Sequence, residues 1–354
     1  MWVTSSLTTA LTPTTVALGN FDGVHRGHRR VIQPIVVDSL SPAASGGKRL
    51  PGDSSPGAYS GGDTSTSLSG TEGCVGLIAP AAVSAHPYPT VVTFHPHPQE
   101  FFSGESRLLL TPFDQKVLQL QALGVEQLVQ LPFDRELADL SPSAFVETIL
   151  VNQLRATQIS VGENFQFGCQ RSGTSRDLQM IAGRYGIEVM IVPIQTCEHA
   201  AISSSSIRQL LQEGAIAAAN YLLGYDYCLV GTVVPGAQLG RTLGFPTANL
   251  QIPGIKFLPR QGVYAVRVTS STLKPDLGTL SGVMNLGFRP TVDGHQQVIE
   301  VHLLDWSGDL YGQTLVVSLE QFLRPEQKFS TLDDLQAQIQ LDCRAARAIL
   351  MPPR

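Results

Sequence analysis

The first two hundred residues alternate between short apolar runs and stretches with helical periodicity. The runs end at glycine or proline, which is typical of buried strands. Between them, apolar positions recur three and four apart behind a Thr-Pro or Ser-Pro pair, which predicts capped helices. We expect strands at residues 16–18, 89–96, 126–133, 157–165 and 187–194, and helices at 28–36, 111–125, 141–154 and 177–186.

Strands that alternate with helices imply a parallel sheet with helices on both faces. The first half is therefore predicted to be a Rossmann-like α/β domain spanning residues 1–200. Ligands of such sheets bind beyond the carboxyl ends of the strands. Glycine- and histidine-containing stretches follow several of these strands, so a site is expected at that edge.

From residue 227 the pattern changes to short strands separated by glycine and proline turns, and one helix closes the chain. This helix begins at a Thr cap with acidic residues in its first turn. An antiparallel β-barrel with a terminal helix fits the pattern. The strands are expected at residues 227–234, 262–270, 280–287, 297–306 and 313–323, and the helix at 331–350.

Residues 201–224 are helical and rich in small side chains, and are predicted to connect the two halves. We expect few contacts to cross this connector, because it carries few large apolar residues outside its helix. The second domain is accordingly predicted to span residues 225–354.

Residues 39–73 have a different composition from the rest of the first half. Of these 35 residues, 23 are Ser, Gly, Pro or Thr, so few apolar groups are present to offset the entropy of ordering. We interpret the segment as a flexible insertion in a surface loop; a phosphorylated regulatory loop is the alternative.

Composition narrows the classes of function. The chain has 354 residues, 43% of them apolar, and a formal net charge of −5, which argues against nucleic acid as a partner. No apolar run reaches membrane-spanning length, so no membrane association is expected. Five scattered cysteines without a Cys-x-x-Cys pair disfavour a zinc site or a disulfide framework. A cytoplasmic location is the simplest expectation.

The stretch GNFDGVHRGH, residues 19–28, combines glycines with two histidines between a strand and a helix. The first turn of a helix has unpaired N–H groups and a dipole that favours anions, so the stretch can bind phosphate. His25 and His28 could hydrogen-bond phosphate oxygens and stabilise a departing phosphate. Two solvated imidazoles in a surface turn are the alternative.

Three other stretches of the first half are weak signals singly. VTFHPHP places His95 and His97 at a strand end, VGENFQFGCQRSG ends a strand in a loop with aromatic residues and Arg171, and ISSSSIR presents hydroxyls with Arg208 one turn into a helix. Exposed imidazoles, a packed Phe pair and a simple Ser cap are the structural alternatives. Together these stretches bring His, Arg, Ser and glycine N–H groups to one sheet edge, which indicates nucleotide phosphate chemistry.

The second half contains its own candidate site around PTAN, residues 246–249. Three preceding glycines (Gly236, Gly240 and Gly244) allow close backbone approach to phosphates, and Thr247 and Asn249 offer oxygens for Mg²⁺. A glycine-rich hairpin with a turn Asn is the alternative. Strand alternation puts Glu300 on the face opposite Ile299 and Val301, where the carboxylate is either merely solvated or able to take a proton from a substrate hydroxyl.

These stretches, in this order, resemble the bifunctional riboflavin kinase/FAD synthetase (FMN adenylyltransferase) family. GNFDGVHRGH is similar to the HxGH nucleotidyltransferase motif, and LLLTPFDQKVLQLQALGV and LPFDRELADLSPSAFVETIL resemble the adenylyltransferase half. GTVVPGAQLGRTLGFPTANL, GVYAV, GVMNLGFRPTVDG and EVHLLDWSGDLYGQ resemble the riboflavin kinase module. The likeness covers nearly the whole chain except the insertion.

The resemblance implies two ATP-dependent steps that require Mg²⁺: riboflavin is phosphorylated to FMN in the barrel, and AMP is then transferred to FMN in the first domain, giving FAD and pyrophosphate. The implied catalytic residues are Glu300 as general base, His28, and Arg208 beside the departing pyrophosphate. The expected nucleotide- and phosphate-binding residues are Gly19, Phe21, Asp22, Gly23, His25, Gly27, His28, Ser203, Ser204, Ser205, Arg208, Gly236, Gly240, Gly244, Thr247 and Asn249. Flavin binding is assigned to His97, Asn164, Phe165, Phe167, Arg171 and Arg289.

Two departures from the family pattern are visible. His95 stands where the family often has an acidic residue, and Ser205 stands where it has Thr, which keeps the hydroxyl. Two rival functions remain at this point: a nucleotidyltransferase for another small phosphate, which leaves the barrel unused, and a non-catalytic flavin-binding protein, which leaves Glu300 beside PTAN unexplained. The sequence does not indicate an oligomeric state.

Overall fold

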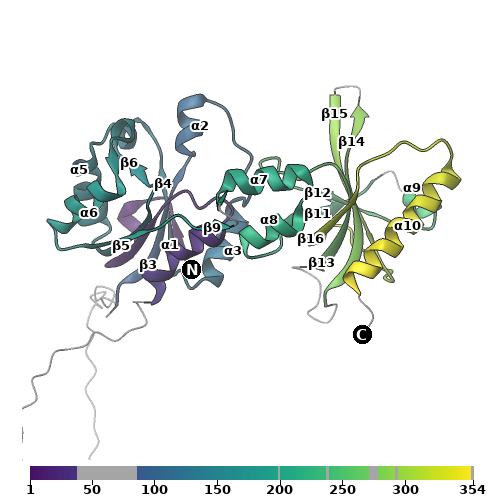
Figure 1. Cartoon of the computed structure of the whole chain (residues 1–354), viewed down its shortest axis with the longest axis horizontal. Helices are drawn as coiled ribbons and strands as arrows, with labels where there is room; N and C mark the ends of the chain where they lie inside the picture. The colour runs from purple at the N-terminus through teal and green to yellow at the C-terminus, as the bar shows by residue number, and fades with distance from the viewer. Residues whose placement is uncertain (38–85, 198–199, 237–238, 271–277, 292–293, 352–354) are drawn as a thin grey trace, which may run out of the picture.

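The computed structural model describes residues 1–37, 86–197, 200–236, 239–270, 278–291 and 294–351. They form a parallel sheet with flanking helices and a β-barrel with a terminal helix, with two helices between them (Figure 1). The predicted insertion 39–73 lies outside the described residues.

The first sheet has six strands, and each of its five pairs of neighbouring strands is parallel, which confirms the predicted class. Their order is β1-β4-β3-β2-β5-β8, so β5 and β3 flank β2 on opposite sides. The strand order reverses beside β2, with β3 and β4 on one side and β5 and β8 on the other, and such folds bind ligands at this point. The strands are β1 (Trp2–Thr4), β2 (Thr14–Leu18), β3 (Tyr88–His95), β4 (Gln127–Pro132), β5 (Ala156–Gly162) and β8 (Glu188–Val192).

Helices cover both faces of this sheet, as expected. Along β2, Val16 and Leu18 belong to one buried cluster and Ala17 to another, because successive side chains point to opposite faces. The first cluster includes residues of α5, the π-helix that continues it, and α6, and the second includes residues of α1 and α3. The helices are α1 (Arg26–Val37), α3 (Phe113–Ala122), α5 (Pro142–Phe145) with the π-helix Val146–Gln153, and α6 (Ser175–Gly183).

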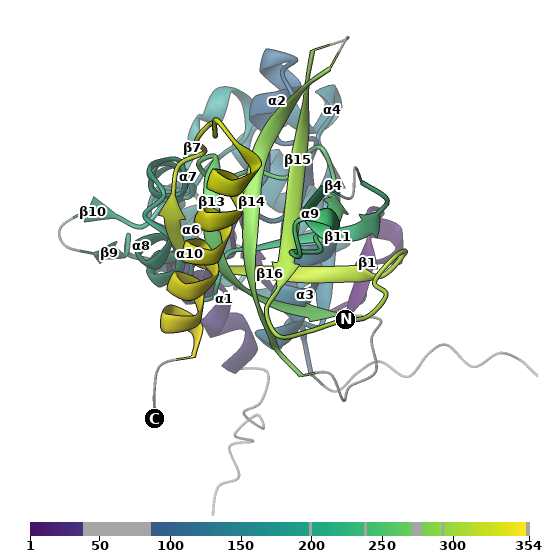
Figure 2. The ribbon, with the colours of Figure 1, turned by 90° about the vertical axis from the view of Figure 1, so that its right-hand side faces the viewer.

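The second domain is a closed barrel of antiparallel strands in the order β11-β12-β15-β14-β13-β16. Five of the six strands were predicted, and the missed one, β12, contains the end of PTAN. The terminal helix α10 (Leu332–Leu350) is capped by Thr331 and packs outside β13 and β14 (Figure 2). The strands are β11 (Cys228–Val234), β12 (Ala248–Gln251), β13 (Gly262–Ser270), β14 (Leu280–Thr291), β15 (Gly294–Leu303) and β16 (Thr314–Arg324).

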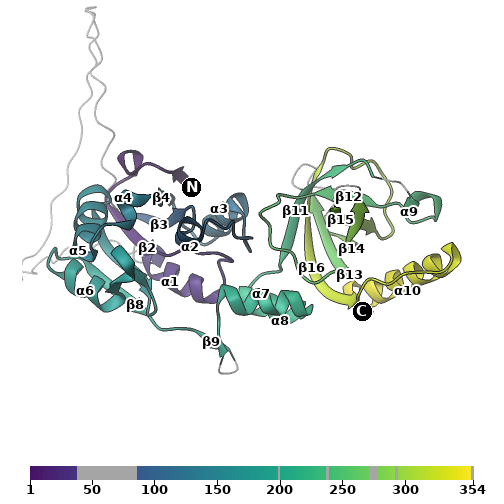
Figure 3. The same ribbon diagram turned by 90° about the horizontal axis from the view of Figure 1, so that it is seen from above.

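The connector differs from expectation. Residues 201–224 contain α7 (Ser204–Glu213) and α8 (Ile216–Leu223), which lie between sheet and barrel (Figure 3). Their buried apolar side chains belong to the same core as those of the barrel strands, so the expectation of few contacts was wrong. Large apolar residues spaced along the two helices, rather than their small residues, determine the packing. These core residues are Ile207, Leu211, Ile216, Leu222 and Leu223.

This packing changes where the barrel can be cut from the chain. A fragment 225–354 should be insoluble or unfolded, whereas 201–354 should fold, because only the longer fragment retains the apolar side chains of α7 and α8. Burial of each large side chain is worth about 2 kcal/mol, so five approach the whole stability of a domain, about 5–15 kcal/mol. Thermal unfolding and sedimentation of the two fragments test this, and a well-folded shorter fragment would contradict it.

Candidate active sites

A cavity of about 740 Å³ opens at the carboxyl ends of the parallel strands. Its walls come from the segments that follow β2, β3, β4, β5 and β8, and from the first turns of α1 and α7. Two helix N-termini therefore face one cavity, and each provides partial positive charge and N–H donors. Such a cavity suits an elongated phosphate-bearing ligand. Lining residues that the sequence singled out are Gly19, Phe21, Asp22, His25, Gly27, His28, His97, Asn164, Phe165, Phe167, Arg171, Ser203, Ser204 and Ser205.

The loop after β2 has an unusual backbone. Phe21, Gly23 and Val24 all have positive φ, at 49°, 91° and 38°. Such conformations are rare for Phe and Val and persist where surrounding contacts enforce them. Gly23 N–H donates to the Thr111 hydroxyl at 2.8 Å, and the Lys116 ammonium donates to the Asn20 carbonyl at 2.9 Å. The loop is thus held by Thr111, just before α3, and by Lys116 within it. The cap of α3 is Pro112 and not the expected Thr111.

His25 and His28 lie together at the cavity. Their rings stack with centroids 3.6 Å apart, and Gly27 leaves the space that the His25 ring occupies. Burial lowers the pKa of His25 to about 4, and burial followed by the charges of His25 and Lys116 lowers the pKa of His28 well below its usual value. Both imidazoles are therefore neutral at pH 7 and can each donate one N–H to a phosphate.

The buried His25 makes stability depend on pH. Its pKa is about 4 in the folded chain and 6.5 in the unfolded chain, so the unfolded state binds more protons between these values and stability falls as pH drops through this window. Between pH 7 and pH 5 the loss from His25 should be about 2 kcal/mol. Urea unfolding should show a smaller difference between the two pH values for His25→Gln than for the unsubstituted chain.

The unsubstituted chain, unfolded in urea at both pH values, provides the reference for this measurement. An equal difference in His25→Gln and the unsubstituted chain would contradict the buried neutral state of His25.

The serines before and within α7 have distinct roles. Ser203 caps the helix by accepting from Ser206 N–H at 3.1 Å, and the Ser204 hydroxyl donates to the Asp22 carbonyl at 2.7 Å. Ser205 is exposed and lines the cavity, so its hydroxyl is the one best placed for a ligand.

Arg208 does not line the cavity. Its guanidinium pairs with Asp22, and Asp22 does line the cavity. The guanidinium also donates to the Leu108 carbonyl at 2.9 Å. The side chain is only 14% exposed. Its role beside a departing phosphate stays a prediction, in which the guanidinium acts from just behind the cavity wall.

All five candidate flavin ligands of the first domain line the same cavity. Phe165 and Phe167 stack with centroids 5.7 Å apart, and Phe167 is buried against Phe145. His97 caps the short helix α2 (Pro98–Ser103), where its Nδ1 accepts from Gln99 N–H at 3.0 Å. Its ring thus has a structural task in addition to the predicted one.

The sequence interpretation missed several residues of this cavity. A second group of aromatic side chains also lines the cavity, and Phe102 of this group is 68% exposed. An exposed aromatic side chain at a cavity mouth is suited to stack on a planar ligand. Arg107 also lines the cavity, and burial followed by the charge of Arg208 lowers its pKa. The Phe and Arg residues of the stretch FHPHPQEFFSGESR could have indicated most of these additional cavity residues from the sequence. The missed residues discussed here are Phe94, Phe102, Phe133 and Arg107.

The barrel brings the second set of candidates together. Asn249 on β12 lies opposite Glu300 on β15. A Cβ on Gly236 would fall within 2.1–2.6 Å of the Asn249 amide, and one on Gly240 within 2.4 Å of the Phe245 carbonyl. These two glycines therefore let the loop fold onto PTAN, a different reason from the predicted phosphate approach. The third, Gly244, has a φ of +82°, which favours glycine.

Glu300 lies on the predicted face of its strand. Its neighbours Ile299 and Val301 are buried in the core, and Glu300 itself is partly exposed. On the same face, His302 Nδ1 lies 2.9 Å from the Pro246 carbonyl, which brings this strand against PTAN. Arg289 lies in β14, and its side chain is outside what the structure describes.

The residues around PTAN fit a magnesium ion. The Thr247 hydroxyl and the Asn249 amide oxygen are hard oxygen donors, which Mg²⁺ prefers. Within the described ranges, no three or more His, Cys, Asp or Glu side chains form a group that could hold a metal. A few oxygens beside a nucleotide phosphate are typical of Mg²⁺ in phosphoryl-transfer sites.

Family models match both halves of the chain. A model described as FAD synthetase matches residues 7–42 and 78–206, and one described as riboflavin kinase matches residues 223–350. The cavity lies in the first match, and the PTAN loop with Glu300 lies in the second.

Relatives match over nearly the whole length. Bifunctional riboflavin kinase/FMN adenylyltransferases from Escherichia coli, Haemophilus influenzae and Bacillus subtilis are 37%, 33% and 31% identical, each over 94% of this chain and 90–93% of their own. A crystal structure from Streptococcus pneumoniae, described as a macrolide-efflux protein, has a TM-score of 0.76 at 26% identity and covers 98% of both chains. In the part of this chain that the structure describes, no helix is long and apolar enough to span a membrane. With both halves matched in their expected order, the chain belongs to the bifunctional riboflavin kinase/FMN adenylyltransferase family.

Proposed function

We propose that this chain makes FAD from riboflavin in two steps. The barrel transfers the γ-phosphoryl group of ATP to riboflavin, giving FMN and ADP. The first domain then transfers AMP from a second ATP to FMN, giving FAD and pyrophosphate. The observation that carries the proposal is that one chain, which matches the bifunctional relatives over 94% of its length, contains two separate candidate sites for phosphate chemistry.

In the kinase step, Glu300 is proposed to take the proton from the attacking ribityl hydroxyl. A hydroxyl is a poor nucleophile at neutral pH, so a positioned carboxylate helps. Thr247 and Asn249 would hold Mg²⁺, which neutralises charge on the phosphates when bound. The strand register supports this arrangement, because Asn249 and Glu300 are opposite each other on β12 and β15.

In the adenylyl step, a phosphate oxygen of FMN attacks the α-phosphorus of ATP and pyrophosphate leaves. The nucleophile is already an anion, so no general base is needed and positioning dominates. The neutral imidazoles of His25 and His28, the N-terminus of α7 and the Ser205 hydroxyl are proposed to bind the phosphates. The Phe102 and Phe165 side chains are proposed to contact the flavin ring.

Incubation with riboflavin and Mg-ATP, followed by chromatography over time, tests the proposal. FMN should appear first and FAD afterwards, with pyrophosphate formed in amounts equal to FAD. Riboflavin that binds unchanged would instead indicate a flavin-binding protein. Failure with flavins but AMP transfer to another small phosphate would indicate a different nucleotidyltransferase. ATP dependence makes the cytoplasm the proposed location.

A further inference from the structure

The barrel contacts the adenylyltransferase half through the segment Pro253–Phe257, which precedes β13. Leu109 N–H donates to the Ile255 carbonyl at 2.7 Å, and Phe257 N–H donates to the Leu109 carbonyl at 2.8 Å. Leu109 and Lys256 thereby form a parallel β-bridge between the two halves. The Leu110 side chain is fully buried in the core that the barrel shares with α7 and α8.

Lys256 is a buried cation at the centre of this contact. It is 3% exposed, its Nζ donates to the Leu110 carbonyl at 2.6 Å and to Gln115 Oε1 at 2.9 Å, and it lies 4.1 Å from the Tyr227 ring centroid. Among the described residues no carboxylate lies in ion-pair distance of it. Burying an ammonium in this way is costly unless its donors are used. Burial lowers its pKa to about 8, so most of the charge remains at pH 7.

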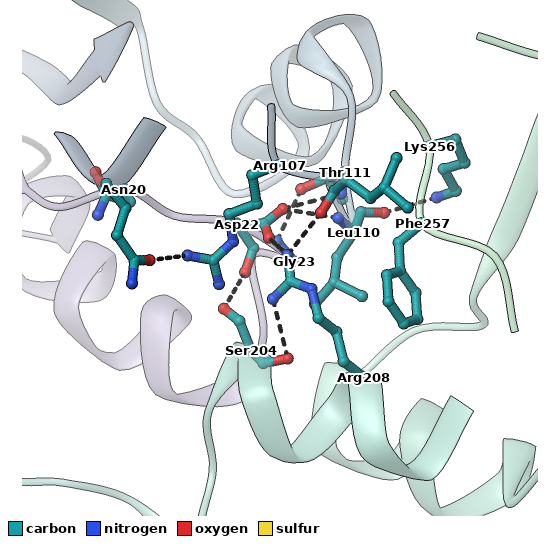
Figure 4. A network of polar contacts seen from close by, with 12 residues as sticks. Asn20, Asp22, Gly23, Arg107, Leu110, Thr111, Ser204, Arg208, Lys256 and Phe257 are labelled. Carbon is teal, nitrogen blue, oxygen red and sulfur yellow. Dashed lines mark hydrogen bonds and ion pairs between the residues drawn. The ribbon is translucent and has the colours of Figure 1, made fainter. Parts of the chain in front are cut away.

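The loop that Lys256 holds extends to the cavity. The N–H groups of Leu110 and Thr111 donate to Asp22 Oδ1 at 2.9 and 3.2 Å, and the other oxygen of Asp22 pairs with Arg208 (Figure 4). Asp22 is 6% exposed and lines the cavity. A continuous set of hydrogen bonds therefore runs from the barrel lysine to the cavity wall.

Arg208 also contacts the barrel directly. Its guanidinium lies 5.5 Å from the centroid of the Phe257 ring, beside its bond to the Leu108 carbonyl. Two of its neighbours are thus Leu108, from the loop that the barrel holds, and Phe257, from the barrel itself. The position of Arg208 behind the cavity depends on both halves of the chain.

We propose that Lys256 is a positioning residue for adenylyl transfer: from the kinase barrel it holds the loop Leu108–Thr111, and through this loop it fixes Asp22 and Arg208 at the cavity wall. The inference rests on the proposed function, since it takes the cavity as the site of adenylyl transfer. A lysine fits the task because its several donors hold both the loop carbonyl and Gln115 of α3. Small displacements of groups beside reacting phosphates cost large factors in rate.

Lys256→Met in the full chain tests this, because methionine has a similar length but no donor or charge. Adenylylation of supplied FMN should fall at least tenfold in kcat, with less than a threefold change in KM for FMN. The kinase rate should stay within twofold. Lys256→Arg, which keeps a cationic donor, should recover most of the loss. Arg344→Met, at an exposed position of α10, removes one positive charge from the same half of the chain and should leave both rates unchanged.

A double-mutant cycle separates positioning through Arg208 from a general effect on stability. If Lys256 acts through Arg208, Lys256→Met should lower the adenylylation rate less than threefold in the Arg208→Lys background. The inference would be overturned if the losses caused by the two substitutions multiply in the double variant. It would also be overturned if both activities fall equally in Lys256→Met, or if its adenylylation rate is unchanged. If Lys256→Met does not fold, Phe257→Leu replaces it and should lower only adenylylation, at least threefold; an unchanged rate would again overturn it.

The two proposals fail separately. An unsubstituted chain that makes no FAD from FMN and Mg-ATP would defeat the proposed function. An unsubstituted chain that makes FAD, with Lys256→Met equally active, would defeat only the positioning role.

Discussion

Glu300→Gln should slow riboflavin phosphorylation about a hundred- to ten-thousandfold, the usual contribution of general-base catalysis. Glutamine keeps the shape of the side chain and removes its basicity. Glu300 lies opposite Asn249 in the strand register, with its face turned away from the buried Ile299 and Val301. The KM for ATP should change little, because the glycine loop, Thr247 and Asn249 remain. Steady-state kinetics with riboflavin and Mg-ATP measures both quantities.

Adenylylation of supplied FMN should be unchanged in the same protein, since that reaction is assigned to the other domain. Glu320→Gln is the matched control: Glu320 is also a barrel glutamate in mid-strand, but it pairs with Arg267 at 2.8 Å. Its kinase rate should stay within about twofold. A Glu300→Gln kinase rate within a few-fold of normal would mean that the hydroxyl loses its proton elsewhere. Equal falls of both activities would mean that the two reactions share one site.

His28→Ala should nearly abolish FAD formation while FMN formation continues. Removing one donor to a developing phosphate charge typically costs about a hundredfold or more in rate. The neutral, half-buried imidazole of His28 lines the cavity and stacks on His25 at the first turn of α1, where it can serve as such a donor. The adenylylation rate with supplied FMN, measured as pyrophosphate release, checks the effect.

The kinase rate of His28→Ala shows whether the barrel is still folded, and thermal unfolding of the same protein checks the fold of the first domain. His86→Ala, at an exposed histidine of the same domain, should retain both activities. Normal FAD formation by His28→Ala would show that the imidazole is structural and that the motif was misinterpreted.

The architecture was predictable where local pattern and burial agree. The apolar runs of the first half became buried parallel strands, because a strand covered on both faces needs apolar residues throughout. Two strands of the six-stranded sheet and the barrel were missed for physical reasons. β1 is an edge strand of three residues, two of them exposed, and β12 contains the polar end of PTAN. Neither has the alternation or the continuous apolar run that identifies a strand.

The candidate site was predictable only as far as topology brings strand ends together. That rule correctly placed His25, His28 and Ser205 in one cavity. It could not place Arg208 behind the wall, since its pairing with Asp22 is a tertiary contact across 186 positions. Lys256 gave no signal at all, because its environment comes from Leu110, Gln115 and Tyr227, which are distant in the sequence.

Helix α7 has consequences for gene recombination between relatives. Its first turn, with Ser203–Ser205, lines the cavity of one domain, while Ile207 and Leu211 lie in the core of the other. A crossover after α8 would join a foreign barrel to side chains that evolved for another core. A crossover before residue 202 would keep that core intact but import foreign phosphate-binding groups. Chimeras joined after α8 should lose stability, and chimeras joined before residue 202 should lose adenylylation. The two halves are therefore expected to change in a correlated way along this helix.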